Sequence, residues 1–176
     1  AFVSLASTLV PGDTAIADVF VRDRDAGTTT LESRSSAGIA GNGGSAAPGL
    51  TDDGRYLVFH SEASDPLGGD ASTAQDIFVR DRAGGSTTRV SVASGGAQSN
   101  GLSDDPSISA VGRYVAFLSL ATNLVAGDSN AASDIFVHDL QTGLTTRVSV
   151  SSQGAQANGA SATPLISADG RHVAFY

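Results

Sequence analysis

The stretch PLISADGRHVAF (residues 164–175) shows the pattern on which this chain is built: a short apolar run, a glycine turn and a second apolar run. Its glycine, Gly170, has counterparts at Gly112 and Gly54, so the pattern recurs at an interval of 58 residues. An aspartate that opens an Asp-Val/Ile-Phe-Val run and an Asn-Gly pair keep the same interval (Asp18, Asp76 and Asp134; Asn42, Asn100 and Asn158). A fixed period of this kind indicates a repeat protein made of one supersecondary unit.

Each unit contains four runs that are typical of β-strands. Residues 106–110 and 113–120 flank a turn, and the second of these runs is apolar on both faces, which predicts a buried strand. Residues 134–139 form a short apolar run, and a Gln-Thr-Gly turn leads to residues 145–150, whose polar and apolar side chains alternate as in an outer strand. No segment has a helical period. We therefore expect an all-β fold of β-propeller blades, each with four antiparallel strands.

The residues of the pattern resemble the TolB-type, WD-repeat-like β-propeller repeat. Pro-x-Ile-Ser-x-Asp-Gly-Arg-x-Val-Ala-Phe at residues 164–175 and Asp-Ile-Phe-Val-x-Asp at residues 134–139 carry the resemblance, which extends over the whole chain. The chain departs from the pattern at Val111 and at Gly49. The resemblance implies blades around an axis, with the first strand of each unit innermost. It also implies a binding or assembly platform of bacterial envelopes, and therefore an extracellular or periplasmic location, or an accessory domain of a peptidase.

The repeat predicts one propeller segment over residues 1–176. The units are expected at about 1–47, 48–105 and 106–163, and residues 164–176 would supply the first two strands of a further or exchanged blade. Propellers close with about four to eight blades, so three units leave the ring incomplete. Two sources of further blades remain open: a second copy of the chain, giving the preferred homodimer of about six blades, or the remainder of a longer propeller.

Composition excludes several classes of function. The formal net charge is −8 and all ten basic residues are arginine, so the chain lacks the basic surface that binds nucleic acid. No apolar run reaches the roughly 18 residues of a membrane-spanning helix, and no insertion into a membrane is expected. The chain has no cysteine and no methionine. The absence of methionine favours a processed product or an excerpt of a longer polypeptide.

One loop carries side chains that could hold calcium. Asp128, Asn130 and Asp134 place oxygen atoms two and six positions apart, and calcium prefers clustered carboxylates and amides. The pattern is incomplete, because the counterparts of Asn130 are Ser72 and Ala15 and the full Asp-x-Asp-x-Asp-Gly motif is missing. The alternative is that Asp128 and Asp134 accept hydrogen bonds from the loop and fix the start of the next strand.

The long connections between units repeat a polar motif, Gly-Ala-Gln-x-Asn-Gly, at Gln98 and Asn100 and again at Gln156 and Asn158. Asn-Gly pairs favour turns, which explains the repetition without a ligand. A polar side chain repeated once per blade could also line a face that binds a glycan or a peptide.

No set of residues predicts an enzyme. His60, His138 and His172 occupy different positions of the repeat, so they are not expected to share a metal or acid–base site. No Ser, His and Asp set has a recognisable catalytic context. We therefore expect a non-catalytic structural and protein-interaction scaffold. The alternatives are a glycan- or peptide-binding propeller and an accessory propeller domain of a secreted hydrolase or peptidase.

Overall fold

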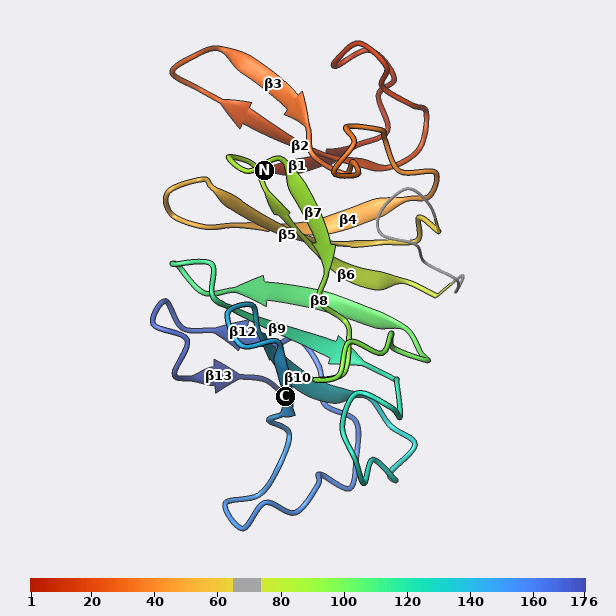
Figure 1. Ribbon diagram of the computed structural model, residues 1–176, viewed down its shortest axis with the longest axis vertical. Coiled ribbons are helices and arrows are strands. Elements are labelled where there is room, and N and C mark those ends of the chain that lie inside the picture. Colours follow the sequence, from red (N-terminus) through yellow and green to blue (C-terminus); the bar gives the residue numbers. More distant parts are fainter. Residues whose placement is uncertain (65–73) are drawn as a thin grey trace.

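The computed structural model describes residues 1–64 and 74–176, and in this part of the chain the regular structure consists of β-strands without helices. The sheets lie one after another along the molecule (Figure 1). Within the described residues, no helix occurs that is long and apolar enough to cross a membrane. The strands are β1 (Phe2–Ser4), β2 (Asp18–Asp23), β3 (Thr28–Leu31), β4 (Ser45–Leu50), β5 (Tyr56–Ser61), β6 (Asp76–Asp81), β7 (Ser86–Arg89), β8 (Ser103–Ile108), β9 (Tyr114–Ser119), β10 (Asp134–Asp139), β11 (Leu144–Arg147), β12 (Leu165–Ile166) and β13 (Val173–Ala174).

The two complete blades confirm the predicted four-stranded unit. Strands β4-β5-β6-β7 form one antiparallel meander and β8-β9-β10-β11 form the next. The first sheet has only β1, β2 and β3, and β1 takes the place of the second strand, because Ser4 pairs with Asp18 as Ser61 pairs with Asp76. Strands β12 and β13 correspond to the first two strands of a unit. We number the blades 1 to 3 by the sheets that begin with β1, β4 and β8.

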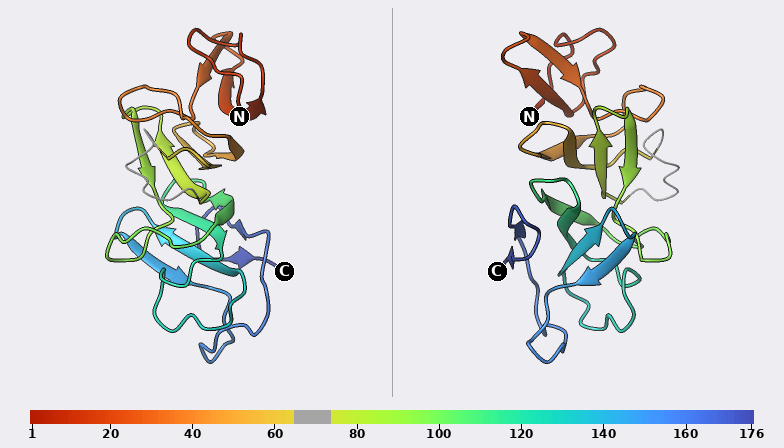
Figure 2. Two further views of the ribbon diagram at one scale, coloured as in Figure 1. Left: turned by 90° about the vertical axis from the view of Figure 1, so that its right-hand side faces the viewer. Right: turned by 60° about the vertical axis from the view of Figure 1, so that its left-hand side comes forward.

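The blades are stacked in an open row that does not close into a ring (Figure 2). The first strand of each unit faces its counterpart in the next blade, since β4 contacts β8 and β8 contacts β12. This arrangement agrees with an innermost first strand. The inner strands begin at Ser45 and Ser103, a few residues before the expected unit boundaries at 48 and 106.

Each blade is held by a pair of stacked phenylalanines from its two central strands. Phe59 of β5 stacks on Phe78 of β6 with ring centroids 5.9 Å apart, and Phe117 stacks on Phe136 in blade 3 at the same distance. All four rings are fully buried. Burying one such side chain stabilises the fold by about 1.5–3 kcal/mol, which explains why the central runs are apolar on both faces.

The aspartate that opens the third strand of each unit is a buried structural residue. Asp134 Oδ1 accepts a hydrogen bond from Ser149 Oγ at 2.6 Å, and Ser149 Oγ accepts one from the N–H of Ile135 at 3.1 Å. The same bonds occur in the other blades, from Ser33 to Asp18 and from Ser91 to Asp76. The carboxylate therefore fixes the end of the outer strand against the start of its neighbour, which explains its repetition.

The inner strands contain a bulge at a residue of unusual conformation. The pairing of β4 with β5 shifts between Ala46 and Gly49, and Ala47 there has a φ of 49°. Asp105 and Thr163, one and two repeats later, have φ values of 49° and 51°. Non-glycine residues rarely adopt this left-handed region, so β4 and β8 hold local backbone strain, and Thr163 holds it just before β12.

Neighbouring blades meet through a tyrosine that lies on a glycine. A Cβ added to Gly112 would lie 2.2 Å from Cδ2 of Tyr56, and one added to Gly170 would lie 2.2 Å from Cδ2 of Tyr114. Both glycines have positive φ, 73° and 74°. The turn of one blade therefore needs a residue without a side chain, so that the aromatic ring of the preceding blade can pack against its backbone.

Candidate functional site

At each junction between blades, a threonine of the edge strand binds the connection that leaves the preceding blade. After β3, residues 34–36 run along the edge strand β7 of the next blade. Thr87 Oγ1 donates to the carbonyl oxygen of Arg34 at 2.5 Å, and the N–H of Thr87 donates to Ser36 Oγ at 2.9 Å. Thr145 makes the same two bonds, to the carbonyl oxygen of Val92 and to Ser94 Oγ. Each connection thus covers the edge strand of the following blade, which would otherwise be free to pair with other chains.

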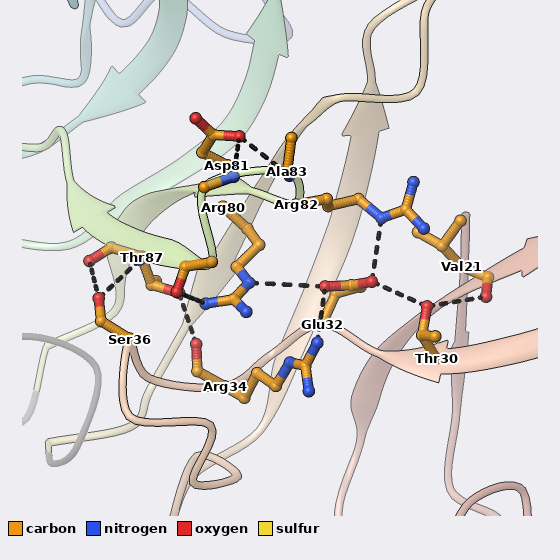
Figure 3. Close-up of polar contacts among 12 residues, drawn as sticks. Val21, Thr30, Glu32, Arg34, Ser36, Arg80, Asp81, Arg82, Ala83 and Thr87 are labelled. Atoms are coloured by element: carbon orange, nitrogen blue, oxygen red, sulfur yellow. Dashed lines mark hydrogen bonds and ion pairs between the residues drawn. The ribbon is translucent and has the colours of Figure 1, made fainter.

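The first junction contains a buried cluster of charges, drawn in Figure 3. The carboxylate of Glu32 lies 2.9 Å from Nε of Arg82, 3.5 Å from Nε of Arg80 and 3.8 Å from Nη2 of Arg34. It also accepts a hydrogen bond from Thr30 Oγ1 at 2.8 Å. The side chains of Glu32 and Arg80 are only 3% and 4% exposed.

Burial lowers the pKa of the Arg80 guanidinium, and the neighbouring charge of Arg34 acts in the same direction. Glu32 opposes this shift by its opposite charge. The cluster joins blades 1 and 2, because Glu32 follows β3 while Arg80 and Arg82 belong to β6 and the turn after it. A carboxylate held by guanidiniums in this way is costly to desolvate and very costly to leave without its partners.

The second junction has apolar residues at two of the same positions and a histidine at the third. Val90 stands where blade 1 has Glu32, and it is fully buried in a cluster to which Leu140, the counterpart of Arg82, contributes. His138 replaces Arg80, and its Nδ1 lies 2.8 Å from Thr145 Oγ1. Burial lowers the pKa of His138. The two junctions therefore share their backbone geometry and differ in the chemistry of their side chains.

Sequence reasoning missed the charged junction, although a signal was present. Glu32 is one of only two glutamates in the chain, and it stands where the other units have Val90 and Val148. Arg82 stands where the next unit has Leu140. A comparison of the copies position by position would have shown that an acid and a base replace two apolar residues together.

The residues of the predicted calcium site lie together, and the side chains of Arg147 and Gln156 contact both of its carboxylates. Nη1 of Arg147 lies 3.5 Å from Asp128 Oδ1 and 3.4 Å from Asp134 Oδ2. Nε2 of Gln156 donates to both carboxylates, at 2.9 and 2.8 Å, and Asn130 turns its amide nitrogen toward Asp134 at 3.3 Å. The guanidinium of Arg147 thus supplies positive charge beside both carboxylates, a contact that neither sequence-based interpretation included.

Over residues 1–64 and 74–176 there is no group of three or more His, Cys, Asp or Glu side chains that could hold a metal ion. The first blade has Thr14 near this position, and its hydroxyl donates to Asp18 at 2.7 Å. Ser72, the counterpart of Asn130 in the second unit, lies outside the described residues. Calcium binding stays a prediction.

Three of the repeated Gln and Asn residues tie connections together: Asn100 and Gln156 by their side chains and Gln98 by its backbone carbonyl. Nδ2 of Asn100 donates to Thr122 Oγ1 at 3.0 Å, and its Oδ1 accepts from the N–H of Thr122 at 2.8 Å. The carbonyl oxygen of Gln98 accepts from Nδ2 of Asn123 at 2.7 Å. Gln156 belongs to the Asp128 and Asp134 group described above, whereas Asn158 is exposed. A glycan or peptide ligand for these residues stays a prediction.

The three histidines have separate surroundings. His60 Nδ1 lies 2.5 Å from Asp104 Oδ1 of the next blade, His138 lies at the second junction, and His172 is exposed in the last turn. Their scatter through the repeat thus corresponds to different contacts in the structure.

The comparisons with known proteins concern the fold. No family model matches the chain, and no curated protein matches its sequence. The crystal structure of TolB from Acinetobacter baumannii matches over 90% of this chain with 16% identity and a TM-score of 0.53. The structure of a putative TolB from Agrobacterium tumefaciens matches over 92% of this chain with 19% identity and the same TM-score. The chain has a TolB-like β-propeller fold.

The TolB-like blades of this chain correspond to part of those proteins. The match spans 31% of the Acinetobacter chain and 51% of the Agrobacterium chain. A third match, the crystal structure of the tricorn protease, covers 70% of this chain with 18% identity and a TM-score of 0.47.

Proposed function

We propose that this chain is a non-catalytic protein-interaction and scaffold module whose TolB-like blades associate with further blades. The observation that carries the proposal is the repeated junction. Thr87 and Thr145 each receive the connection of the preceding blade along an edge strand. Thr29 has the same register in blade 1, since it pairs with Arg22 as Thr87 pairs with Arg80. In the part of the chain that the structure describes, no connection makes the corresponding bonds to Thr29.

Exposed apolar side chains support the same proposal. Phe2 is 37% exposed, whereas its counterparts Phe59 and Phe117 are fully buried between blades. Leu165 and Tyr176, at the other side of the row, are 65% and 81% exposed. Apolar surface of this kind, beside an uncovered edge strand, is typical of a surface that packs against another protein.

Two sources can supply the further blades. A second copy of the chain would give a homodimer of about six blades, and a longer polypeptide would supply blades in the same chain. The location outside the cytoplasm that the TolB-type resemblance implies, extracellular or periplasmic, is part of the proposal.

The experiment is light scattering coupled to size-exclusion chromatography over a range of concentrations. A mass of about twice the 17.6 kDa of one chain supports association of copies. The variant Thr29→Pro tests the face, because proline removes the outward N–H of an edge strand that can still pair on its other side. Where copies associate through this face, the variant should lower the mass to that of one chain without lowering the stability of the monomer.

The matched control is Thr87→Pro, which removes the N–H bond to Ser36 Oγ inside the first junction. It should destabilise the monomer. A single-chain mass for the unchanged protein at all concentrations would contradict association of copies. Equal destabilisation by both proline variants would contradict the assignment of Thr29 to a docking face.

A further inference from the structure

The face of blade 1 that points away from blade 2 repeats the arrangement that binds Glu32. Arg22 and Arg24 stand one repeat before Arg80 and Arg82. Nη1 of Arg22 donates to Thr29 Oγ1 at 3.1 Å, as Nη1 of Arg80 donates to Thr87 Oγ1 at 3.2 Å. The outward face of blade 1 therefore carries two guanidiniums and an edge threonine at the positions that Arg80, Arg82 and Thr87 have on blade 2, where they contact blade 1.

The two faces differ in what covers them. The side chains of Arg80 and Arg82 are 4% and 26% exposed and lie at the Glu32 carboxylate. Arg22 and Arg24 are exposed, and neither forms an ion pair with any residue in 1–64 or 74–176. The arginine pair of blade 2 thus binds a carboxylate, whereas the corresponding pair of blade 1 is accessible to a partner.

We propose that this face of blade 1 docks a propeller blade that carries a carboxylate side chain at the end of its outermost strand, in the position that Glu32 has in blade 1. The proposal rests on the proposed function and names the chemistry of the partner. The carboxylate binds the guanidiniums of Arg22 and Arg24. The connection after it follows the edge of β3, where Thr29 donates its hydroxyl to a carbonyl oxygen and its N–H to a serine-like hydroxyl.

The requirement for an acid distinguishes between the two sources of further blades. The counterpart of Glu32 in blade 3 is Val148. A second copy that docked through blade 3 would place Val148 against two arginines, and the desolvated guanidiniums would lack a counter-charge. At the second junction Val90 instead belongs to an apolar cluster against which Leu140 packs, and His138 stands at the position of Arg80. The partner of this face is therefore a blade of different sequence, with an acid where blade 3 has valine.

The test supplies the missing acid to the chain itself. Val148→Glu converts the outgoing edge of blade 3 into one that matches Arg22 and Arg24, and Val148→Gln is its uncharged control. Association of the full chain is measured by sedimentation equilibrium at low and high salt. We expect the glutamate variant to associate at least about tenfold more tightly than the glutamine variant, since one charge-assisted pair contributes this much or more. The difference should shrink at high salt and disappear when Arg22 and Arg24 are both replaced by serine.

Equal association of the glutamate and glutamine variants, including the absence of association in both, would overturn this inference. An unchanged protein that already forms a tight dimer, unaffected by serine at positions 22 and 24, would also overturn it while supporting association of copies. A monomeric unchanged protein with a dimeric glutamate variant would support the inference and contradict the homodimer.

Discussion

Replacing Gly112 by alanine tests how the blades are locked together. The glycine has a φ of 73°, and an added Cβ would lie 2.2 Å from the ring of Tyr56 in the preceding blade. The left-handed backbone costs an alanine about 1–2 kcal/mol. Forcing the ring aside adds about 1–3 kcal/mol, as in other overpacked interiors. We therefore expect the free energy of unfolding to fall by about 2–5 kcal/mol, measured by urea denaturation.

Gly54 provides the matched control for this variant. Its φ is 69°, and the nearest atom to an added Cβ is Nη1 of Arg82 at 3.7 Å, an ordinary contact. Gly54→Ala should therefore lose only the backbone contribution of about 1–2 kcal/mol. In the double variant Tyr56→Ala with Gly112→Ala, the two losses should be less than additive, because the smaller side chain removes the overlap. Equal losses for the two single glycine variants would refute the proposed lock between Tyr56 and Gly112.

Three further predictions concern charge, strain and pH. Glu32→Val alone should lower the free energy of unfolding by about 3–5 kcal/mol, because it leaves buried arginines without their partner, whereas Glu32→Val with Arg80→His and Arg82→Leu should recover most of that loss in urea denaturation. Ala47→Gly should raise the free energy of unfolding by about 0.5–1 kcal/mol, seen as a higher urea midpoint, because glycine adopts the φ of 49° without strain. An unchanged or lower midpoint would contradict strain in the inner strand. Burial lowers the pKa of His138, so the unfolded chain binds a proton first as the pH falls below about 6.5, and stability present above that pH is lost below it. His138→Asn should flatten this dependence between pH 7 and pH 5, and an unchanged slope would exclude His138 as its cause.

The sequence predicted the blades because their pattern is local. Strand pairs such as β5 with β6 are joined by short connections, and their apolar runs and glycine turns repeat within one period. The charged junction depends instead on how separate blades pack, since Glu32 and Arg82 are far apart in the sequence. Gln156 illustrates the same limit. Its repeated motif is compatible with a turn or with a binding face, whereas its amide donates to Asp128 and Asp134 across a connection whose course no local pattern predicts.

The ion pairs along the turns show that a repeated charge can be structural as well. Arg55 donates to Asp81 from Nε at 3.2 Å and from Nη2 at 2.9 Å, and this pair holds the pKa of the Asp81 carboxyl at about 2. Arg113 binds Asp139 through the same two nitrogens. These pairs occur in both complete blades and therefore do not distinguish one junction from the other. The arginines that do so are the few whose counterparts differ between copies.

Repeated blades must stack in the correct order, and the junction residues distinguish one stacking face from another. Blades 2 and 3 share most of their strand residues, so their stacking faces would otherwise be interchangeable. Docking blade 1 on blade 3 would place Glu32 against Leu140 and His138, where a carboxylate would be buried with little compensation. Docking blade 2 on its own kind of face would place Val90 against Arg80 and Arg82, which would then lack their acid. Each wrong junction thus leaves a buried charge without a partner, and wrong pairing between repeats is a characteristic route to misfolding. The side chains at each junction consequently select the correct neighbouring blade. By the same chemistry, Arg22 and Arg24 select a blade with an acid to lie beside blade 1.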